Sequence, residues 1–375
     1  MAPPGQAGLR LTDPKRREPD MSSVIHEHLQ ASACGAEPTE EERAAAATIL
    51  PMIWGLHISR AVYLAAEFGV ADLLAAGPLT AAALAEATQT GEAALYRVLR
   101  LLAALGVLTE HEPRSFGLTI LGDRLRRDVP ASMRHWAMLA DTVGFRAHEP
   151  ILDVVRTGRT GTEVSYGLTT MERVRGDSRR TARFDAAMSE RTAAFAPSVA
   201  ATYDYSGMHV IADIGGGQGT LLAAILRRHK HLRGILFDVP DVAPRAADVL
   251  RDAGVADRCE VVGGDFFAGV PGGADGYLLA NVLHDWDDGR AVQILRACRH
   301  AMRPGGRVLI AERLIPTEPH DALPVLLSDL NMLLVSGGQE RTNTEYGTLL
   351  TTAGLQPGRV LPVTPPYGVI EGLAT

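Results

Sequence analysis

The second half of the chain alternates between short apolar segments rich in β-branched residues and longer segments with helical periodicity. Short apolar segments are typical of buried strands, and strands that alternate with helices favour a parallel sheet with helices on both faces. The pattern therefore predicts an α/β domain. The predicted strands are 209–214, 234–238, 259–262, 276–282 and 307–312, the helices are 220–229, 243–253 and 290–302, and the closing strand pair is 359–363 and 368–372.

The first half of the chain reads as mainly helical. Thr39, followed by three glutamates, predicts the start of a helix, and apolar residues recur at helical spacing in 61–74 and 93–105. Between these two segments, 79–85 predicts a short helix with Thr80 as its cap. Two short strands are predicted at 106–110 and 115–119. Helices followed by a small hairpin are the outline of a winged helix, which is either a DNA-binding module or a module for packing and dimerisation.

The charge of the chain favours the second interpretation. The third helix of the outline exposes only Arg97 and Arg100, and the formal net charge is −7, whereas DNA-binding surfaces are usually basic. The three cysteines are widely spaced, no signal peptide is recognisable, and the longest apolar stretch, 44–56, is too short to cross a membrane. We therefore predict a cytoplasmic protein with no nucleic-acid or membrane partner.

Composition divides the chain into three parts. Residues 1–39 are rich in proline, glycine and charge, which predicts a disordered extension, and Met21 is an alternative start. We place a helical domain, which also lines the substrate site, at 40–197 and the α/β domain at 198–375.

A glycine-rich turn joins the first predicted strand of the α/β domain to the helix after it. Asp213 is followed by glycines that include Gly215, Gly217 and Gly219, which allow a tight turn and close approach of a ligand. A dinucleotide-binding turn needs a further glycine where this chain has Thr220, and a phosphate-binding loop needs a lysine that is absent. The turn therefore predicts a ligand without a phosphate group to bind, although such a loop is sometimes only a tight turn.

Acidic residues end the next two predicted strands. Asp238 is placed to accept hydrogen bonds from both hydroxyls of a ribose. Asp265 is placed to accept one from an adenine amino group, while Phe266 packs on the purine. Either aspartate alone could simply cap a turn. Together with the glycine-rich turn, they predict a nucleoside-containing ligand at the carboxyl ends of the strands.

The order of motifs resembles the O-methyltransferase family that includes plant caffeic-acid and bacterial polyketide and phenazine enzymes. The resemblance covers about residues 40–375 and implies S-adenosylmethionine as cofactor, S-adenosylhomocysteine as product, a Rossmann-like methyltransferase domain and a winged-helix domain that forms a homodimer. One departure is Ala280, where the plant enzymes have a lysine that contacts the cofactor. The motifs are D-I-G-G-G-Q-G, F-D-V-P, G-D-F-F, N-V-L-H-D-W-D-D, G-G-Q-E-R-T and T-E-Y-G-T-L-L-T-T-A-G-L.

His284 follows the fourth predicted strand, at the edge of the sheet where the cofactor is expected. An imidazole there is able to take the proton of a phenol as the oxygen attacks the methyl group. Glu312 and Glu340 are the candidate carboxylates that orient it, as the resemblance implies. Glu340 has the alternative roles of pairing with Arg341 or capping the next helix.

The residues around His284 and at the acceptor pocket are less specific. We interpret Asp287 and Asp288 as helix caps and Trp286 as a core residue. The resemblance places Phe184 and Met188 beside the methyl-transfer site, although their helical spacing also fits a core. Asn331 lies on an apolar helix and is a candidate contact to the acceptor.

Together these residues predict transfer of a methyl group to a hydroxyl of an aromatic secondary metabolite. No metal is expected, because no cluster of carboxylates or imidazoles is spaced for one along the sequence. The alternatives are a relative that uses the cofactor for non-methylating chemistry, such as hydroxylation, and a winged-helix regulator that senses the cofactor.

Overall fold

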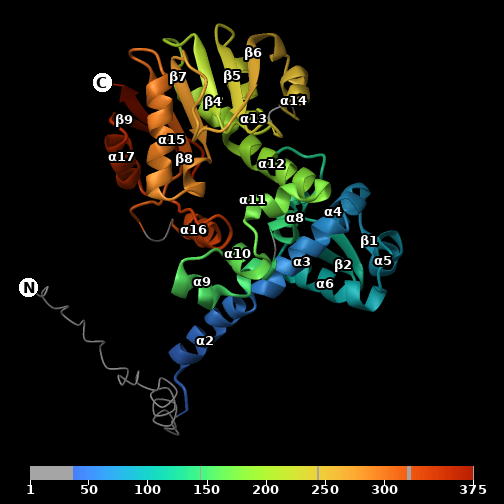
Figure 1. Cartoon of the computed structure of the whole chain (residues 1–375). Coiled ribbons are helices and arrows are strands. Elements are labelled where there is room, and N and C mark those ends of the chain that lie inside the picture. Colours follow the sequence, from blue (N-terminus) through green and yellow to red (C-terminus); the bar gives the residue numbers. More distant parts are fainter. Residues whose placement is uncertain (1–36, 144, 243–244, 319–321, 375) are drawn as a thin grey trace, which may run out of the picture. The chain divides into compact units, whose positions relative to one another are not determined.

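The structure is a computed structural model that describes residues 37–143, 145–242, 245–318 and 322–374 (Figure 1). The extension predicted to be disordered and the alternative start at Met21 lie almost wholly outside these residues. Residues up to Leu56 contact mainly one another and form one compact unit, and residues from His57 onward form a second. Each unit is therefore described by itself.

The second unit contains a seven-stranded sheet in the order β6-β5-β4-β7-β8-β10-β9. The first five strands in this order are parallel, and β10 runs antiparallel to both β8 and β9. The predicted mostly parallel sheet with a closing strand pair is therefore confirmed. The strands are β4 Val210–Ile214, β5 Arg233–Asp238, β6 Cys259–Gly263, β7 Gly276–Ala280, β8 Arg307–Arg313, β9 Leu355–Pro362 and β10 Tyr367–Ala374.

Consecutive residues of the central strands face opposite sides of the sheet and enter two separate cores. In β7, Leu278 belongs to one core cluster, whereas its neighbours Tyr277 and Leu279 belong to the other. This alternation follows from the two-residue repeat of a strand and requires helices on both faces. The first core takes residues from α12 Ser178–Thr202, α13 Thr220–Arg228 and α14 Ala246–Asp252, and the second takes residues from α15 Asp288–Ala301 and α17 Asn343–Thr352.

A smaller sheet in the order β1-β3-β2 packs with helices between residues 55 and 118. The predicted helix–helix–hairpin outline is present, and Thr80 caps α5 as its position before an alanine run suggests. The core of this region contains Leu84, Leu99 and Phe116, all fully buried. Its elements are α3 Gly55–Glu67, α4 Val70–Leu73, β1 Leu79–Thr80, α5 Ala81–Thr88, α6 Glu92–Ala104, β2 Leu108–Glu112 and β3 Ser115–Leu118.

The helix predicted over 61–74 is interrupted at Gly69. The backbone of Gly69 is left-handed, with φ of 66°, so α3 ends before it and α4 begins after it. Glycine adopts this conformation without the steric penalty of a Cβ atom. Periodicity alone predicted one helix because the apolar spacing continues through the break.

The first unit contains α2 Glu40–Ile53, which begins with a capping box between Thr39 and Glu42. Apolar side chains at its end are strongly exposed, with 71% of Met52 and 68% of Ile53 accessible. Among the described helices none is alone long and apolar enough to cross a membrane, and one bent pair, α2 with α3, passes that test of length and composition together.

The residues between the hairpin and β4 form further helices, of which α12 is the longest. Pro197 lies inside α12, which continues to Thr202, so a boundary at 197 crosses this helix. The division at 197 stays a prediction. The other helices are α7 Ile120–Asp123, α8 Arg134–Val143, α9 Ile151–Thr157, α10 Gly161–Tyr166 and α11 Thr170–Arg175, and α16 Leu323–Val335 follows β8.

Candidate active site

The glycine-rich turn connects β4 to α13 at the carboxyl end of the sheet. Gly215, Gly217 and Gly219 all have positive φ, a conformation that other residues adopt only with strain. The backbone N–H groups of Gly215 and Gly216 both donate to the carbonyl of Phe237, at 2.7 and 3.3 Å. A side chain at Gly216 would overlap Leu236 and the Asp213 carboxylate. The turn is therefore held tightly against the end of β5.

Asp213 and Asp238 lie beside this turn, and their predicted contacts to a ligand stay predictions. One carboxylate oxygen of Asp238 accepts from the N–H of Gly217 at 2.8 Å, and the other accepts from Val239 at 2.7 Å. Asp213 is fully buried, and its Oδ2 has no hydrogen-bond partner among the described residues. Burial, together with the charge of Asp238, raises the pKa of Asp213 to about 7. An unpaired buried oxygen at this place suits a ligand that brings its own donor or positive charge.

Asp265 and Phe266 follow β6. Asp265 is exposed and accepts from the N–H of Phe267 at 2.9 Å, so its carboxylate stabilises a local turn. Phe266 is partly buried and meets the ring of Trp286 edge to face, with centroids 5.9 Å apart. Trp286 packs against the second core of the sheet, in agreement with its interpretation as a core residue.

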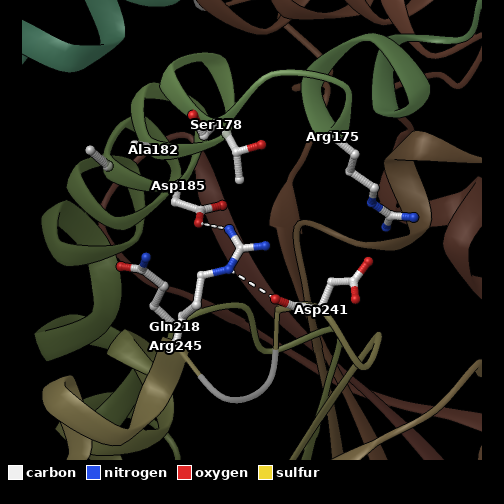
Figure 2. A pocket seen from close by; sticks show the side chains of 9 residues that line it. Arg175, Ser178, Ala182, Asp185, Gln218, Asp241 and Arg245 are labelled. Atoms are coloured by element: carbon white, nitrogen blue, oxygen red, sulfur yellow. Dashed lines mark hydrogen bonds and ion pairs between the residues drawn. The ribbon is translucent and has the colours of Figure 1, made fainter.

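A pocket of about 590 Å³ lies beside the glycine-rich turn. Figure 2 shows Arg175 on one side of it and the guanidinium group of Arg245 between Asp185 and Asp241. Gln218, a residue of the glycine-rich turn, is part of the pocket lining, whereas His284 is not. Sequence reasoning missed Arg175 and Gln218, because nothing in the local pattern places α11 next to the turn.

His284 lies in a short turn, η5 Leu283–Asp285, after β7, and its side chain is only 2% exposed. Its Nδ1 atom lies 3.1 Å from Oε1 of Glu340, at hydrogen-bond distance. Oε2 of Glu312 lies 3.9 Å from the same nitrogen, too far for a hydrogen bond. The structure therefore brings together all three residues that the sequence singled out, with Glu340 as the direct partner.

The two glutamates are held by different contacts. Oε1 of Glu312 accepts from the backbone N–H groups of Val282 and Leu283, at 2.9 and 3.0 Å, and so holds the turn that carries His284. Oε1 of Glu340 accepts from the hydroxyl of Ser328 at 2.6 Å as well as facing the imidazole. The remaining Oε2 atoms of both glutamates are buried without a hydrogen-bond partner in the described part of the chain.

Opposing effects set the pKa of the imidazole. Burial disfavours the charged ring, but the carboxylates of Glu312, Asp285 and Glu340 outweigh burial and raise the pKa of His284. For Glu340 the signs are reversed. Burial acts to raise the pKa of this carboxyl group, but the hydrogen bond to His284 outweighs burial and lowers the pKa below its ordinary value. The geometry therefore favours a proton on Nδ1 that faces Glu340 and leaves Nε2 as the nitrogen with a free lone pair.

The three side chains also form a group whose possible ligand atoms all lie within 4.8 Å of one another. The sequence argument against a metal site therefore fails in three dimensions. It missed this group because His284 and Glu312, and then Glu312 and Glu340, are 28 positions apart in the sequence. Absence of a metal stays a prediction. It is supported by the hydrogen bond that already occupies Nδ1.

Arg341 was not identified from the sequence as part of the site. It is 1% exposed and donates to the carbonyls of Leu283 at 3.1 Å and Trp286 at 2.8 Å, one on each side of His284. Its acidic partner is Asp288, at 2.8 Å, so the alternative in which Glu340 pairs with Arg341 is wrong. Asp288 was expected to be a helix cap; only Asp287 caps α15, by accepting from Arg290 at 2.9 Å.

The backbone beside Glu340 is in close contact with the same turn. The N–H of Gln339 donates to the carbonyl of His284 at 2.9 Å, and a side chain at Gly338 would overlap that carbonyl. After this segment Thr342, and not Glu340, caps α17, in a capping box with Glu345. The segment between α16 and α17 therefore fixes the position of His284 through its backbone as well as through Glu340 and Arg341.

The residues predicted to contact the acceptor lie on two helices. Phe184 and Met188 are partly buried on α12, and Asn331 is partly buried on α16. The side chain of Asn331 forms no hydrogen bond to the described residues. Asn281, which follows Ala280 at the end of β7, has a positive φ of 52° and accepts from the hydroxyl of Tyr367 at 3.1 Å. The roles of these residues stay predictions.

Comparison with known families gives two matches along the chain. The model of the O-methyltransferase dimerisation domain matches residues 51–128, and that of the O-methyltransferase domain matches residues 148–356. The second match alone covers more than half of the chain.

Individual relatives agree with these matches. A phenazine O-methyltransferase of Lysobacter antibioticus is 41% identical over 89% of this chain and 98% of its own length. The solved structure of a mitomycin 7-O-methyltransferase covers 90% of this chain and 100% of its own, with a TM-score of 0.84 and 39% identity. An aclacinomycin 10-hydroxylase of Streptomyces purpurascens is 39% identical over 87% of this chain and 88% of its own.

The sheet, the helices on both faces and these neighbours define an S-adenosylmethionine-dependent methyltransferase with a Rossmann-like fold. Solved neighbours include complexes with S-adenosylmethionine and S-adenosylhomocysteine, and the unpaired Asp213 oxygen beneath the glycine-rich turn fits such a cofactor. The chain belongs to the family of O-methyltransferases with an N-terminal dimerisation domain.

Proposed function

We propose that this enzyme transfers the methyl group of S-adenosylmethionine to a hydroxyl of an aromatic natural product, such as a polyketide or related phenol, with His284 as the general base. The observation that carries the proposal is the buried His284–Glu340 hydrogen bond at the same edge of the sheet as the glycine-rich turn. The relatives named as O-methyltransferases of phenazine and mitomycin support the class of acceptor.

The bound cofactor supplies an electrophilic methyl group on a sulfonium centre. Gly215, Gly217, Asp213 and Asp238 would hold it around the turn. Asp265 and Phe266 would hold its adenine.

Nε2 of His284 would take the hydroxyl proton while the acceptor oxygen forms its bond to the methyl carbon, and the electron pair of the broken carbon–sulfur bond remains on sulfur. Glu340 keeps the other ring nitrogen protonated, and Glu312 adds negative charge that stabilises the imidazolium formed in this step.

Phe184 and Met188 would form the wall against which the acceptor ring packs, and Asn331 would hydrogen-bond to one of its oxygens. Because the side chain of His284 is 2% exposed, the acceptor reaches Nε2 only after neighbouring side chains move. When the side chains return around the bound acceptor, the closed site excludes water from the reaction.

The deciding experiment incubates the protein with radiolabelled S-adenosylmethionine and a panel of phenolic polyketides, with and without EDTA. We expect label in the acceptor, at a rate that EDTA does not change. The relative named as a hydroxylase gives a second candidate, in which the cofactor keeps its methyl group and dioxygen, with an added two-electron reductant, supplies a hydroxyl to the acceptor and releases water. Mass spectra of the products separate the two, since unlabelled, oxygenated products would contradict methyl transfer.

We infer that the enzyme is a homodimer assembled through its N-terminal part, with neither nucleic acid nor membrane as a partner, and that it works in the cytoplasm. The dimerisation-domain match and the exposed apolar side chains at the end of α2 support the dimer.

Light scattering at micromolar concentration should give the mass of two chains. Ile53→Asp should shift the mass towards one chain, whereas Thr48→Asp, at an exposed polar position of the same helix, should not. A wild-type monomer would contradict this inference.

Replacing Asp238 with alanine should weaken binding of S-adenosylhomocysteine by about 1 kcal/mol or more, because charge-assisted hydrogen bonds are lost. Part of the loss should come from the turn, since Asp238 also accepts from Gly217. Calorimetry measures the affinity. Asp252→Ala, at an exposed aspartate at the end of α14, is the matched control. Unchanged affinity in a folded Asp238→Ala protein would remove this residue from the cofactor site.

A further inference from the structure

Arg191 is an arginine of α12 that the mechanism does not use. It lies seven residues after Phe184 and three after Met188, so all three side chains share one face of the helix. Its side chain is partly buried, and its Nε atom is fully buried without a hydrogen-bond partner. Within the described residues its guanidinium group forms neither a hydrogen bond nor an ion pair. A partly buried, unpaired charge of this kind is costly and is expected to have a partner.

The surroundings of Arg191 link it to Trp136 and to the carboxylate beside His284. Its guanidinium carbon is 5.7 Å from the centroid of the Trp136 ring on α8. Its charge also favours the ionised forms of Glu312, near the end of β8, and of Tyr367, at the start of β10. Glu312 belongs with His284 and Glu340 to the group called here the base cluster. Tyr367 in turn stacks on Phe195 of α12, with ring centroids 4.1 Å apart. The guanidinium therefore lies near the Trp136 ring, and its charge acts on a carboxylate of the base cluster.

A second arginine near the same cluster is already paired. Arg313 donates to the hydroxyl of Ser328 at 3.2 Å and lies 3.6 Å from the carboxylate of Glu340. Arg313 thus balances the charge of the base cluster through direct contacts. Arg191 has no such contact, which leaves its donors for a molecule that enters the site.

We propose that Arg191 determines acceptor specificity by binding a carboxylate group carried on the aromatic ring, so that the acceptors are hydroxyaryl carboxylic acids. This inference rests on the proposed function. A guanidinium group presents paired donors that match the two oxygens of a carboxylate, and the neighbouring Trp136 offers a flat apolar surface to the ring of the same molecule. The acceptor hydroxyl would then face His284 while its carboxylate is held from α12.

The competing explanation is that Arg191 only balances the negative charge of Glu312. In that case its removal would disturb His284 and would slow the methylation of every acceptor to the same extent. If Arg191 binds the acceptor, removal affects acceptors that have a carboxylate and leaves their neutral esters nearly unchanged. A comparison of acid with ester therefore separates the two roles.

The experiment measures kcat/KM for a hydroxynaphthoic acid and for its methyl ester, with the wild type, Arg191→Met and the control Arg313→Met. The wild type should prefer the acid. Arg191→Met should lose about tenfold or more on the acid and little on the ester, because hydrogen bonds to a charged group are lost. Arg313→Met should lower both rates by the same factor. Equal losses on acid and ester in Arg191→Met, or a wild type that prefers the ester, would overturn the proposal.

Calorimetry keeps this test separate from that of the proposed function. The hydroxynaphthoic acid is titrated into protein loaded with S-adenosylhomocysteine, where no transfer occurs. If the acid binds with an affinity that Arg191→Met reduces and yet is not methylated, the acceptor site stands and the proposed reaction fails. If the acid does not bind, or binds both proteins equally, the assignment of Arg191 is wrong whatever the reaction.

Discussion

Replacing His284 with alanine should lower kcat by about 10²–10⁴-fold, the usual contribution of a general base. Binding of S-adenosylhomocysteine should change little, because His284 contacts Glu340 and not the glycine-rich turn. The loss should become smaller as the pH approaches the pKa of the acceptor, since an ionised phenolate needs no base. Rates at saturating cofactor over a range of pH, for wild type and variant, check this expectation.

The pH dependence of the wild type follows from the carboxylates around His284. Because they raise the pKa of His284, the proposed base should be neutral and active only above that raised value, and kcat should increase as the pH rises through it. Glu312→Gln removes one of these charges, lowers the pKa of His284 and should move the acidic limb of the profile to lower pH. A limb that stays in place, or a His284→Ala enzyme with full activity at neutral pH, would show that His284 is not the base.

Replacing Arg341 with methionine should reduce both stability and activity. The carbonyls of Leu283 and Trp286 would lose buried donors, and Asp288 would lose its partner, which together should cost about 2–4 kcal/mol of the free energy of unfolding. Because both carbonyls flank His284, kcat should also fall more than the affinity for cofactor. Chemical denaturation and steady-state kinetics measure the two effects.

Arg296→Met is the matched control for this variant. Arg296 lies on α15 and donates to one backbone carbonyl, that of Thr352, near the surface. Its replacement should change the free energy of unfolding by less than about 1 kcal/mol. Arg341→Lys keeps the charge but not the paired donors, and should fall between the wild type and the methionine variant. Equal stability of the two methionine variants would show that Arg341 does not hold the turn.

The elements of the sheet could be predicted because each has a strong local signal. The residues of β7 are apolar on both faces, so the segment is recognisable without its neighbours. The two residues of β1 carry too little pattern to be found, since Leu79 and Thr80 become a strand only by pairing with β3. The break at Gly69 was also missed, because the apolar spacing is the same on both sides of it.

The contacts within the site could not be predicted from the sequence, because they are formed only in the tertiary structure. Motif order identified His284, Glu312 and Glu340, but only three-dimensional placement shows which glutamate is at hydrogen-bond distance. Asp288 begins α15, and Arg341 lies just before the cap of α17, 53 positions later in the sequence. The pairing of Asp288 with Arg341, and the grouping of three possible metal ligands, therefore could not be seen along the chain.

The strand order has a consequence for synthesis of the chain on the ribosome. The strand made last, β10, lies between β8 and β9, and the contacts that orient His284 come from residues 338–341. A nascent chain that has emerged only as far as α15 already contains the glycine-rich turn and Asp238, but no partner for the imidazole. The residues proposed to bind the cofactor are therefore all made before the residues that orient the proposed base, and premature termination after α16 would leave a fragment whose His284 has neither Glu340 nor Arg341.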